Sequence, residues 1–217
     1  QSIAAGGGGA FGFGDGGATG ITATMHTQLG SWGDGSGSGS NTSGAVAVSV
    51  DGGGGITTAG VQSHAIVAQS IGGGGGIVSG LGPFSAVAHA GGNNGVRGFA
   101  SDVTVTNAGT IATQGLAAMG IVAQSIGAGG GFFAGSASAF AGTTIGGATN
   151  KDSGGDAGSV TVSLAGSGTI ATQGDGAFGV LAQSIGGGGG FLGDPTQSNW
   201  QRSNTSQSGL GTQGSID

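Results

Sequence analysis

The sequence predicts an all-β fold, in which a repetitive β-solenoid or stacked β-sheet builds a fibre-like architecture with extended glycine-rich segments and almost no helix. First, the phrase Gln-Ser-Ile followed by a glycine run recurs along the chain. Second, the segments before each copy alternate apolar and polar residues with period two, which is typical of strands. Third, no apolar pattern of helical spacing lasts longer than a turn, and 59 glycines among 217 residues would make helices costly.

The repeated phrase fixes the register of the array. Its copies begin 68, 55 and 59 residues apart, at Gln1, Gln69, Gln124 and Gln183. Only the spacer after each glycine run varies in length, which is the pattern of a solenoid. We therefore expect residues 1–217 to be one continuous repeat array cut from a longer chain, with variable loops between fixed module tails. The tails are 1–11, 45–78, 102–133 and 158–192.

Each complete module tail begins with two short predicted strands. In the first, Val alternates with Ala, Thr or Ser, and the pattern occupies 46–50, 103–105 and 160–164. A glycine-rich segment follows, which is a turn by composition. The second strand is an Ile-x-Thr sequence that begins at Ile56, Ile111 or Ile170.

The third predicted strand contains the repeated phrase and occupies 66–71, 121–126 and 180–185. Apolar residues occur there at both odd and even positions, so we expect this strand to be covered on both faces. A fourth strand is expected after each glycine run, most clearly at 132–140.

The glycine runs have two interpretations. Without Cβ atoms, stacked runs could approach closely as a flat ladder, or could form extended segments resembling polyproline II. Alternatively they are flexible linkers. Close packing is favoured because each run lies between two strand signals at fixed register.

The composition excludes several function classes. All nine acidic residues are Asp, and the net charge is −6. The three basic residues are scattered over the loops, at Arg97, Lys151 and Arg202. Binding of a nucleic-acid backbone needs clustered Lys and Arg, so no nucleic-acid partner is expected. No run of about 18 apolar residues predicts a membrane span, so membrane contact is expected only through an anchor outside this segment.

The sequence offers little for catalysis, and we expect no enzyme activity and no cofactor. His26, His64 and His89 are separate, and no His-Glu-x-x-His pair occurs. We interpret His64 as a partly exposed turn residue. The segment 12–17 matches Gly-x-Gly-x-x-Gly, but such a match arises by chance in a chain this rich in glycine, and no βαβ unit surrounds it.

Calcium is the metal for which the sequence offers candidate ligands, and these are weak: Asp152 and Asp156, in one glycine-rich loop. A calcium site needs about six to eight oxygen ligands, and these aspartates do not recur at equivalent positions between modules. The favoured interpretation is that both are solvated loop carboxylates and that no metal is bound.

The repeated polar residues predict a structural ladder. Gln69, Gln124 and Gln183 share one register, and amide side chains stacked on neighbouring strands can bond to one another. The serines that follow them would face the opposite side of the same strand, at Ser70, Ser125 and Ser184. A ligand-binding role for the glutamines is the less favoured alternative.

The segments Gly-Ile-Val-Ala-Gln-Ser-Ile-Gly-Ala-Gly-Gly-Gly (120–131) and Gly-Val-Leu-Ala-Gln-Ser-Ile-Gly-Gly-Gly-Gly-Gly (179–190) resemble the passenger repeats of bacterial autotransporters. The preceding Gly-Thr-Ile-Ala-Thr-Gln-Gly, at 109–115 and 168–174, is similar to the same family. The resemblance implies type V export, a β-solenoid passenger, and a role in adhesion, aggregation or biofilm formation. It also implies a location that is extracellular or at the Gram-negative cell surface, either anchored to the outer membrane or secreted.

The expected function is therefore structural, as a stalk or filament segment. Its partners would be further repeats or other copies of the chain, end to end or laterally. The alternative is a glycan- or surface-binding adhesin module, for which Trp32 and Trp200 in the expected polar loops 30–44 and 193–211 are the candidate ligand contacts. The third hypothesis is a non-catalytic stalk of a secreted enzyme.

Overall fold

A computed structural model describes residues 2–3, 7–13, 26–29, 41–73, 75–81, 87–90, 98–127, 130–135, 144–145, 155–187, 189–194, 199–203 and 215–217. These residues form strands, turns and bends, and none of them is helical. The prediction of an all-β fold is confirmed for this part of the chain. Accordingly, the described residues contain no helix of the length and hydropathy that a membrane crossing requires.

The strands follow one another in the order β1 (Ser2–Ile3), β2 (Gly7–Phe13), β3 (His26–Leu29), β4 (Asn41–Thr42), β5 (Val46–Val50), β6 (Gly55–Thr58), β7 (Ile66–Ile71), β8 (Gly75–Leu81), β9 (Val87–Ala90), β10 (Gly98–Phe99), β11 (Val103–Asn107), β12 (Thr110–Thr113), β13 (Ile121–Ile126), β14 (Gly130–Gly135), β15 (Thr144–Ile145), β16 (Val160–Leu164), β17 (Thr169–Thr172), β18 (Val180–Ile185), β19 (Gly189–Asp194) and β20 (Asn199–Ser203). We call β5 to β9 the first module, β11 to β15 the second and β16 to β19 the third.

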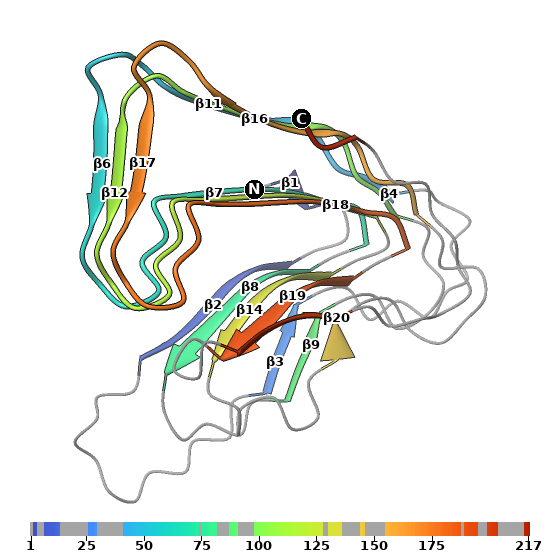
Figure 1. Ribbon diagram of the computed structural model, residues 1–217. Helices are drawn as coiled ribbons and strands as arrows, with labels where there is room; N and C mark the ends of the chain where they lie inside the picture. Colours follow the sequence, from blue (N-terminus) through green and yellow to red (C-terminus); the bar gives the residue numbers. More distant parts are fainter. Residues whose placement is uncertain are drawn as a thin grey trace, which may run out of the picture.

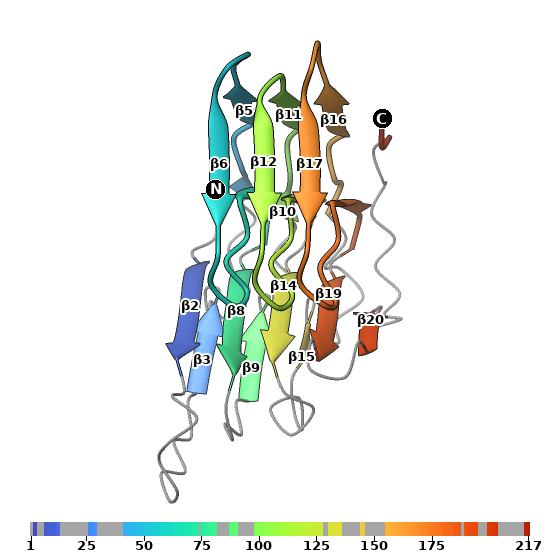
Figure 2. The same cartoon turned by 60° about the vertical axis from the view of Figure 1, so that its left-hand side comes forward.

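Equivalent strands of successive modules lie side by side and form layered sheets (Figure 1). The upper sheet has the order β16-β11-β5, the side sheet β17-β12-β6, and the middle sheet β1-β7-β13-β18. The lower sheet has the order β2-β8-β14-β19-β20, and the outer sheet β15-β9-β3. A short pair of β10 and β4 completes the set. Figure 2 shows β6, β12 and β17 running in the same direction next to one another.

The pairing is parallel and keeps equivalent residues opposite one another. In the middle sheet Ile121 is paired with Ile66 on one side and with Val180 on the other. The short strand β1 continues this register, with Ser2 opposite Ser70. Among the described strand pairs, the antiparallel one is β19 with β20. The sequence spacing between copies of the repeated phrase is thus the register offset between neighbouring strands.

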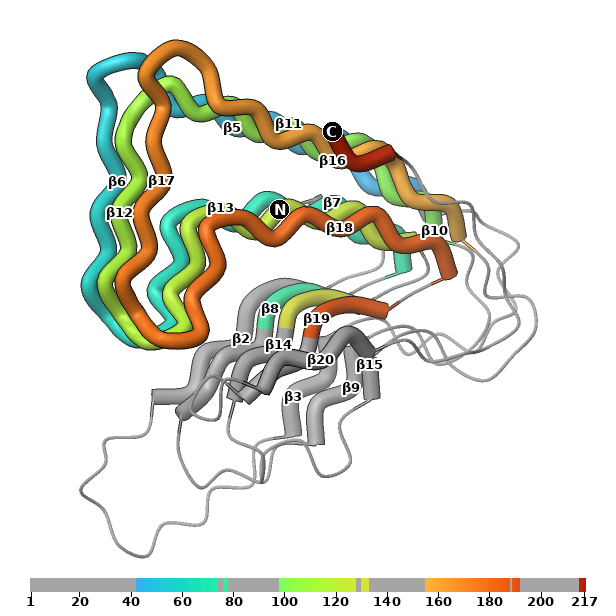
Figure 3. Tube along the Cα trace, in the orientation of Figure 1, coloured from blue at the N-terminus to red at the C-terminus, as the bar shows by residue number. Residues whose placement is uncertain are grey.

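The middle sheet lies between the other layers, which explains its apolar residues at both odd and even positions (Figure 3). All six residues of β13 are buried. Ile121 and Ala123 face a core shared with the upper and side sheets. Val122 faces a second core, where it packs with Phe132 of the lower sheet. The predicted third strand therefore has both faces covered in the second module, as expected, whereas its copy β18 in the third module is only partly buried.

The glycine runs bend the chain and then enter the lower sheet. Gly131 pairs with Gly76 on one side and Gly190 on the other, so the interpretation of these runs as flexible linkers is wrong for the glycines at their ends. They are strand residues and not polyproline II segments. A Cβ on Gly131 would overlap the backbone of Gly76. The fourth strand of the second module consequently begins at Gly130, before the expected Phe132; the expected residues 136–140 lie outside the described part.

Candidate functional site

The repeated glutamines form a hydrogen-bonded column through the middle sheet. Nε2 of Gln69 donates to Oε1 of Gln124 at 2.6 Å, and Nε2 of Gln124 donates to Oε1 of Gln183 at 2.6 Å. All three side chains are buried, with 0%, 0% and 8% of their surface exposed. We call them the glutamine column. Both bonds run from the earlier residue to the later one, so the column has a direction along the stack.

The repeated serines form a second column on the opposite side of the same strands. Oγ of Ser125 donates to the carbonyl of Ser101 at 2.9 Å and accepts the N–H of Gly158 at 2.9 Å. Oγ of Ser70 accepts the N–H of Ser101 at 2.9 Å. Oγ of Ser184 donates to the carbonyl of Gly158 at 2.9 Å. Each bond joins the middle sheet to the segment that leads into an upper strand, and Ser125 bridges two successive modules.

Both columns satisfy buried polar groups with neighbours from other modules. A buried amide or hydroxyl without a partner destabilises a fold, whereas a fully bonded network specifies one arrangement. A shift of one residue would move each glutamine to the face that the serines occupy, because side chains alternate along a strand. The two columns therefore fix which residues of neighbouring strands pair. Because the amides are buried, a large ligand cannot reach them.

A further polar group lies in the bend between β6 and β7. Nδ1 of His64 accepts the backbone N–H of Met119 at 3.0 Å, and the ring packs edge-on against Phe132 with centroids 5.0 Å apart. His64 lies in the connection between β6 and β7 and is half-buried, so the expected partial exposure is confirmed, while its Nε2 atom is buried. Burial lowers the pKa of His64 to about 4, from an ordinary value of 6.5.

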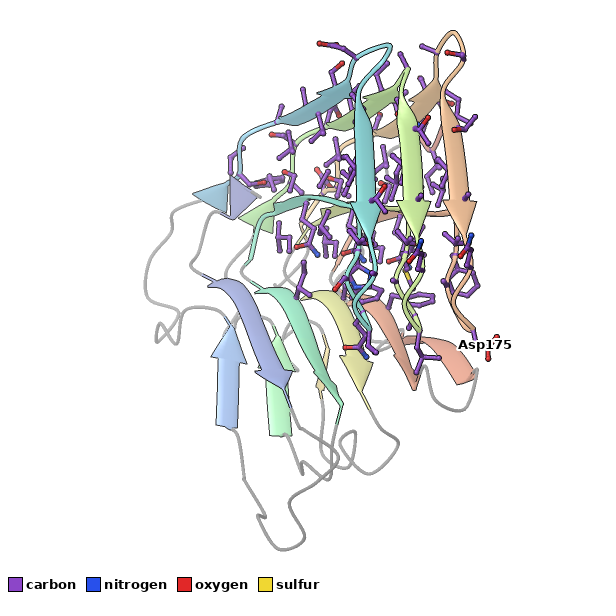
Figure 4. The ribbon with its side chains drawn as sticks, turned by 90° about the vertical axis from the view of Figure 1, so that its left-hand side faces the viewer. Asp175 is labelled. Atoms are coloured by element: carbon purple, nitrogen blue, oxygen red, sulfur yellow. The ribbon has the colours of Figure 1, made fainter. Side chains whose placement is uncertain are left out.

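The other candidate residues are not gathered at one site. His26 and His89 lie on β3 and β9, where His89 is opposite Gln28 and not opposite His26. Asp156 is exposed, and Asp152 lies outside the described residues. Within the described ranges, no group of three or more His, Cys, Asp or Glu side chains could hold a metal ion. Figure 4 shows Asp175, in the bend between β17 and β18 that we call the third bend (174–179), pointing away from the stack.

The tryptophans and the basic residues give no assembled binding surface among the described residues. Trp32, Arg97 and Lys151 lie outside the described part. Trp200 and Arg202 lie on β20, opposite Gly193 and Phe191 of β19. The expectation that residues 200 and 202 lie in a loop is therefore wrong, because both belong to a strand at one edge of the lower sheet.

Sequence reasoning missed several residues that tie the bends to the strands. Oγ1 of Thr58 donates to the carbonyl of Ser63, and Oγ1 of Thr113 donates to the carbonyl of Ala118. The repeated Thr of Ile-x-Thr was a signal that could have revealed this pair. The buried Asn107 gave no such signal, because its counterparts are Val50 and Leu164. Its Nδ2 donates to the carbonyl of Thr169 at 3.1 Å.

No protein-family model matches this sequence, and neither a curated protein nor a solved structure matches it.

Proposed function

We propose that this chain is a non-catalytic segment of a bacterial surface protein, in which stacked modules form a β-solenoid stalk or filament that supports adhesion, aggregation or a biofilm matrix. The observation that carries the proposal is the pairing of equivalent residues in successive modules, sheet after sheet. When modules contact mainly their neighbours, a stack lengthens by adding modules without needing a new core. That property suits a stalk, which holds other domains at a distance, or a filament, which connects copies of the chain.

Exposure at the end of the stack supports the same proposal. Leu164 and Val180, on the third module, have 58% and 42% of their surface exposed. Ile121, the equivalent of Val180 in the second module, is 0% exposed. The apolar side chains at the end occupy positions that a further module covers elsewhere. Further repeats or another copy of the chain would cover them in the same way.

The proposed location is extracellular, as part of an autotransporter passenger at the surface of a Gram-negative cell. This part of the proposal rests on the repeated Ala-Gln-Ser-Ile-glycine phrase.

Removal of one module tests the repetitive architecture. Deleting 103–159 joins Asp102 to Val160, and Val160 occupies the register of Val103. We expect the shortened chain to fold, with an unchanged β-type circular dichroism spectrum and a lower unfolding temperature. A deletion variant of a non-repetitive domain would lose its core, so an unfolded product would contradict the stacked architecture.

The biological role needs a separate measurement. Cells that display the full chain on their surface should sediment and attach to surfaces faster than cells that display the deletion variant. Equal behaviour of both strains and of bare cells would contradict a role in adhesion or aggregation, even if the architecture is correct.

The glycan-binding alternative is distinguished by Trp200, which lies on an edge strand of the lower sheet. Saccharide binding on a glycan array that disappears with Trp200→Ala would favour an adhesin module. Absence of binding by the unsubstituted chain would favour a purely structural segment.

A further inference from the structure

His64 interrupts an otherwise apolar column of residues. The bends between the side and middle sheets stack on one another, and the positions equivalent to His64 in the second and third modules are Met119 and Phe178. Backbone bonds join the first bend to the second: the N–H of Gln62 donates to Leu116, and the N–H of Ala65 donates to Met119. His64 therefore lies at the junction between two modules.

The imidazole is held as a neutral acceptor. Because Nδ1 accepts the N–H of Met119 at 3.0 Å, the ring proton belongs on Nε2. Nε2 is buried and has no hydrogen-bond partner among the described residues. Phe132 packs edge-on against the ring. The neutral form thus makes one good bond, and the described residues around the ring provide no acceptor for a second ring proton.

Among the described residues around His64, none carries a charge that could stabilise an imidazolium. The first bend (60–65) and the second bend (115–120) have no other acidic or basic residue, and neither have β8 and β14. The nearest bend with a carboxylate is the third, where Asp175 is exposed. Desolvation without a counter-ion favours the neutral ring, in agreement with the pKa of about 4.

We propose that His64 is an acid-sensitive latch between the first and second modules. When a proton binds to Nδ1, the acceptor for the Met119 N–H becomes a donor, and two N–H groups then face each other. The hydrogen bond breaks, and the charged ring must leave the apolar column to reach water. The adjoining backbone bonds of Gln62 and Ala65 lose their support, so the first bend separates from the second. This holds whether the stack serves as a stalk or as an adhesin.

The direction of the effect follows from the two pKa values. The pKa of His64 is about 4 in the folded protein and about 6.5 in the ordinary, solvated state. His64 therefore stabilises the closed bend fully above about pH 6.5, and this contribution is lost as the pH falls from 6.5 towards 4. By proton linkage, opening of the bend should become about 30-fold more frequent between pH 7.5 and pH 5.

Amide exchange measured by NMR tests the latch directly. After correction for intrinsic exchange, the protection factors of the Met119, Gln62 and Ala65 amide protons should be about 30-fold lower at pH 5 than at pH 7.5. The amides of Ala117 and Gly120 donate to Asp175 and Phe178 of the third module. They are the internal control and should change much less.

The matched variant is His64→Met, which places in the first bend the residue that the second bend already has. Protonation of aspartates affects both proteins equally, so the difference between them isolates His64. The variant should keep equal protection of Gln62 and Ala65 at both pH values.

Two results would overturn the proposal. One is a ring titration of His64 in the unsubstituted protein with a pKa near 6.5. The other is the same loss of protection in His64→Met. The ring titration needs no variant, so the proposal stays testable if His64→Met does not fold.

Discussion

Nε2 of Gln69 donates to Oε1 of Gln124, which lies 55 residues later in the chain. Gln124 in turn donates to Gln183, so the central glutamine both accepts and donates. Gln124→Ala should therefore destabilise the fold more than Gln183→Ala, because it removes two bonds and leaves two buried amides short of a partner. We expect losses of about 2–4 kcal/mol and about 1–2 kcal/mol in the free energy of unfolding. Urea denaturation measures both values.

Replacement of Gln69, Gln124 and Gln183 together by Ala tests the column as a structural element. The triple variant should unfold at a clearly lower temperature, since three buried side chains and two bonds are removed. An unchanged unfolding temperature would contradict the structural role, and loss of ligand binding without loss of stability would favour the alternative.

The glycines differ sharply in the substitutions that they tolerate, which gives a further prediction. Gly131 has a φ of +155° and lies against the backbone of Gly76, whereas Gly52 has open space around it. Gly131→Ala should cost more than about 3 kcal/mol, since overlap adds to backbone strain. Gly52→Ala, the matched control, should change stability by less than about 0.5 kcal/mol. Similar losses for both variants would contradict close packing of the lower sheet.

Strand order in each module could be predicted from the sequence because the Val-x-Val and Ile-x-Thr patterns recur at fixed distances. The strand 66–71 could even be placed in the interior, because Ile66 and Val67 require apolar surroundings on opposite faces. The register followed from the spacing of the glutamines. Local patterns thus determined which residues pair.

Other features depend on contacts that no local pattern encodes. The inward orientation of His64 requires Met119 to present its N–H, and Met119 is 55 residues away. The antiparallel strand β20 carries Asn199 and Arg202 and has no counterpart in earlier modules, so no repeat predicted it. The candidate residues Trp32 and Asp152 lie in spacers, where neither period nor register constrains a prediction.

The bends give another prediction, at a position where the backbone is left-handed. The φ angles of Gln62, Ala117 and Gly176 are 53°, 52° and 67°. Since two modules already hold side chains in this conformation, Gly176→Ala should fold and lose only about 1 kcal/mol. Gly176→Val should lose more, because β-branched residues rarely adopt it. Urea denaturation of both variants tests the order, and a larger loss for Ala than for Val would contradict it.

The serine column gives the last prediction. Oγ of Ser125 is fully buried and makes two bonds of 2.9 Å, to the carbonyl of Ser101 and from the N–H of Gly158. Ser125→Ala would leave both backbone groups short of a partner inside the protein, at a cost of about 2–3 kcal/mol. Ser163 lies on the exposed side of β16 and serves as the control; Ser163→Ala should change stability by less than about 0.5 kcal/mol.

Amide exchange would show where the loss from Ser125→Ala occurs. Gly158 precedes β16 and Ser101 precedes β11. Removal of the hydroxyl should therefore expose the residues that lead into the upper sheet to exchange before it affects the side sheet. Protection of Gly158 should fall first, and that of Thr169, whose N–H donates to Gly109, should fall only on global unfolding. Equal loss at both amides would mean that the serine stabilises the stack as a whole and not the junction between the middle and upper sheets.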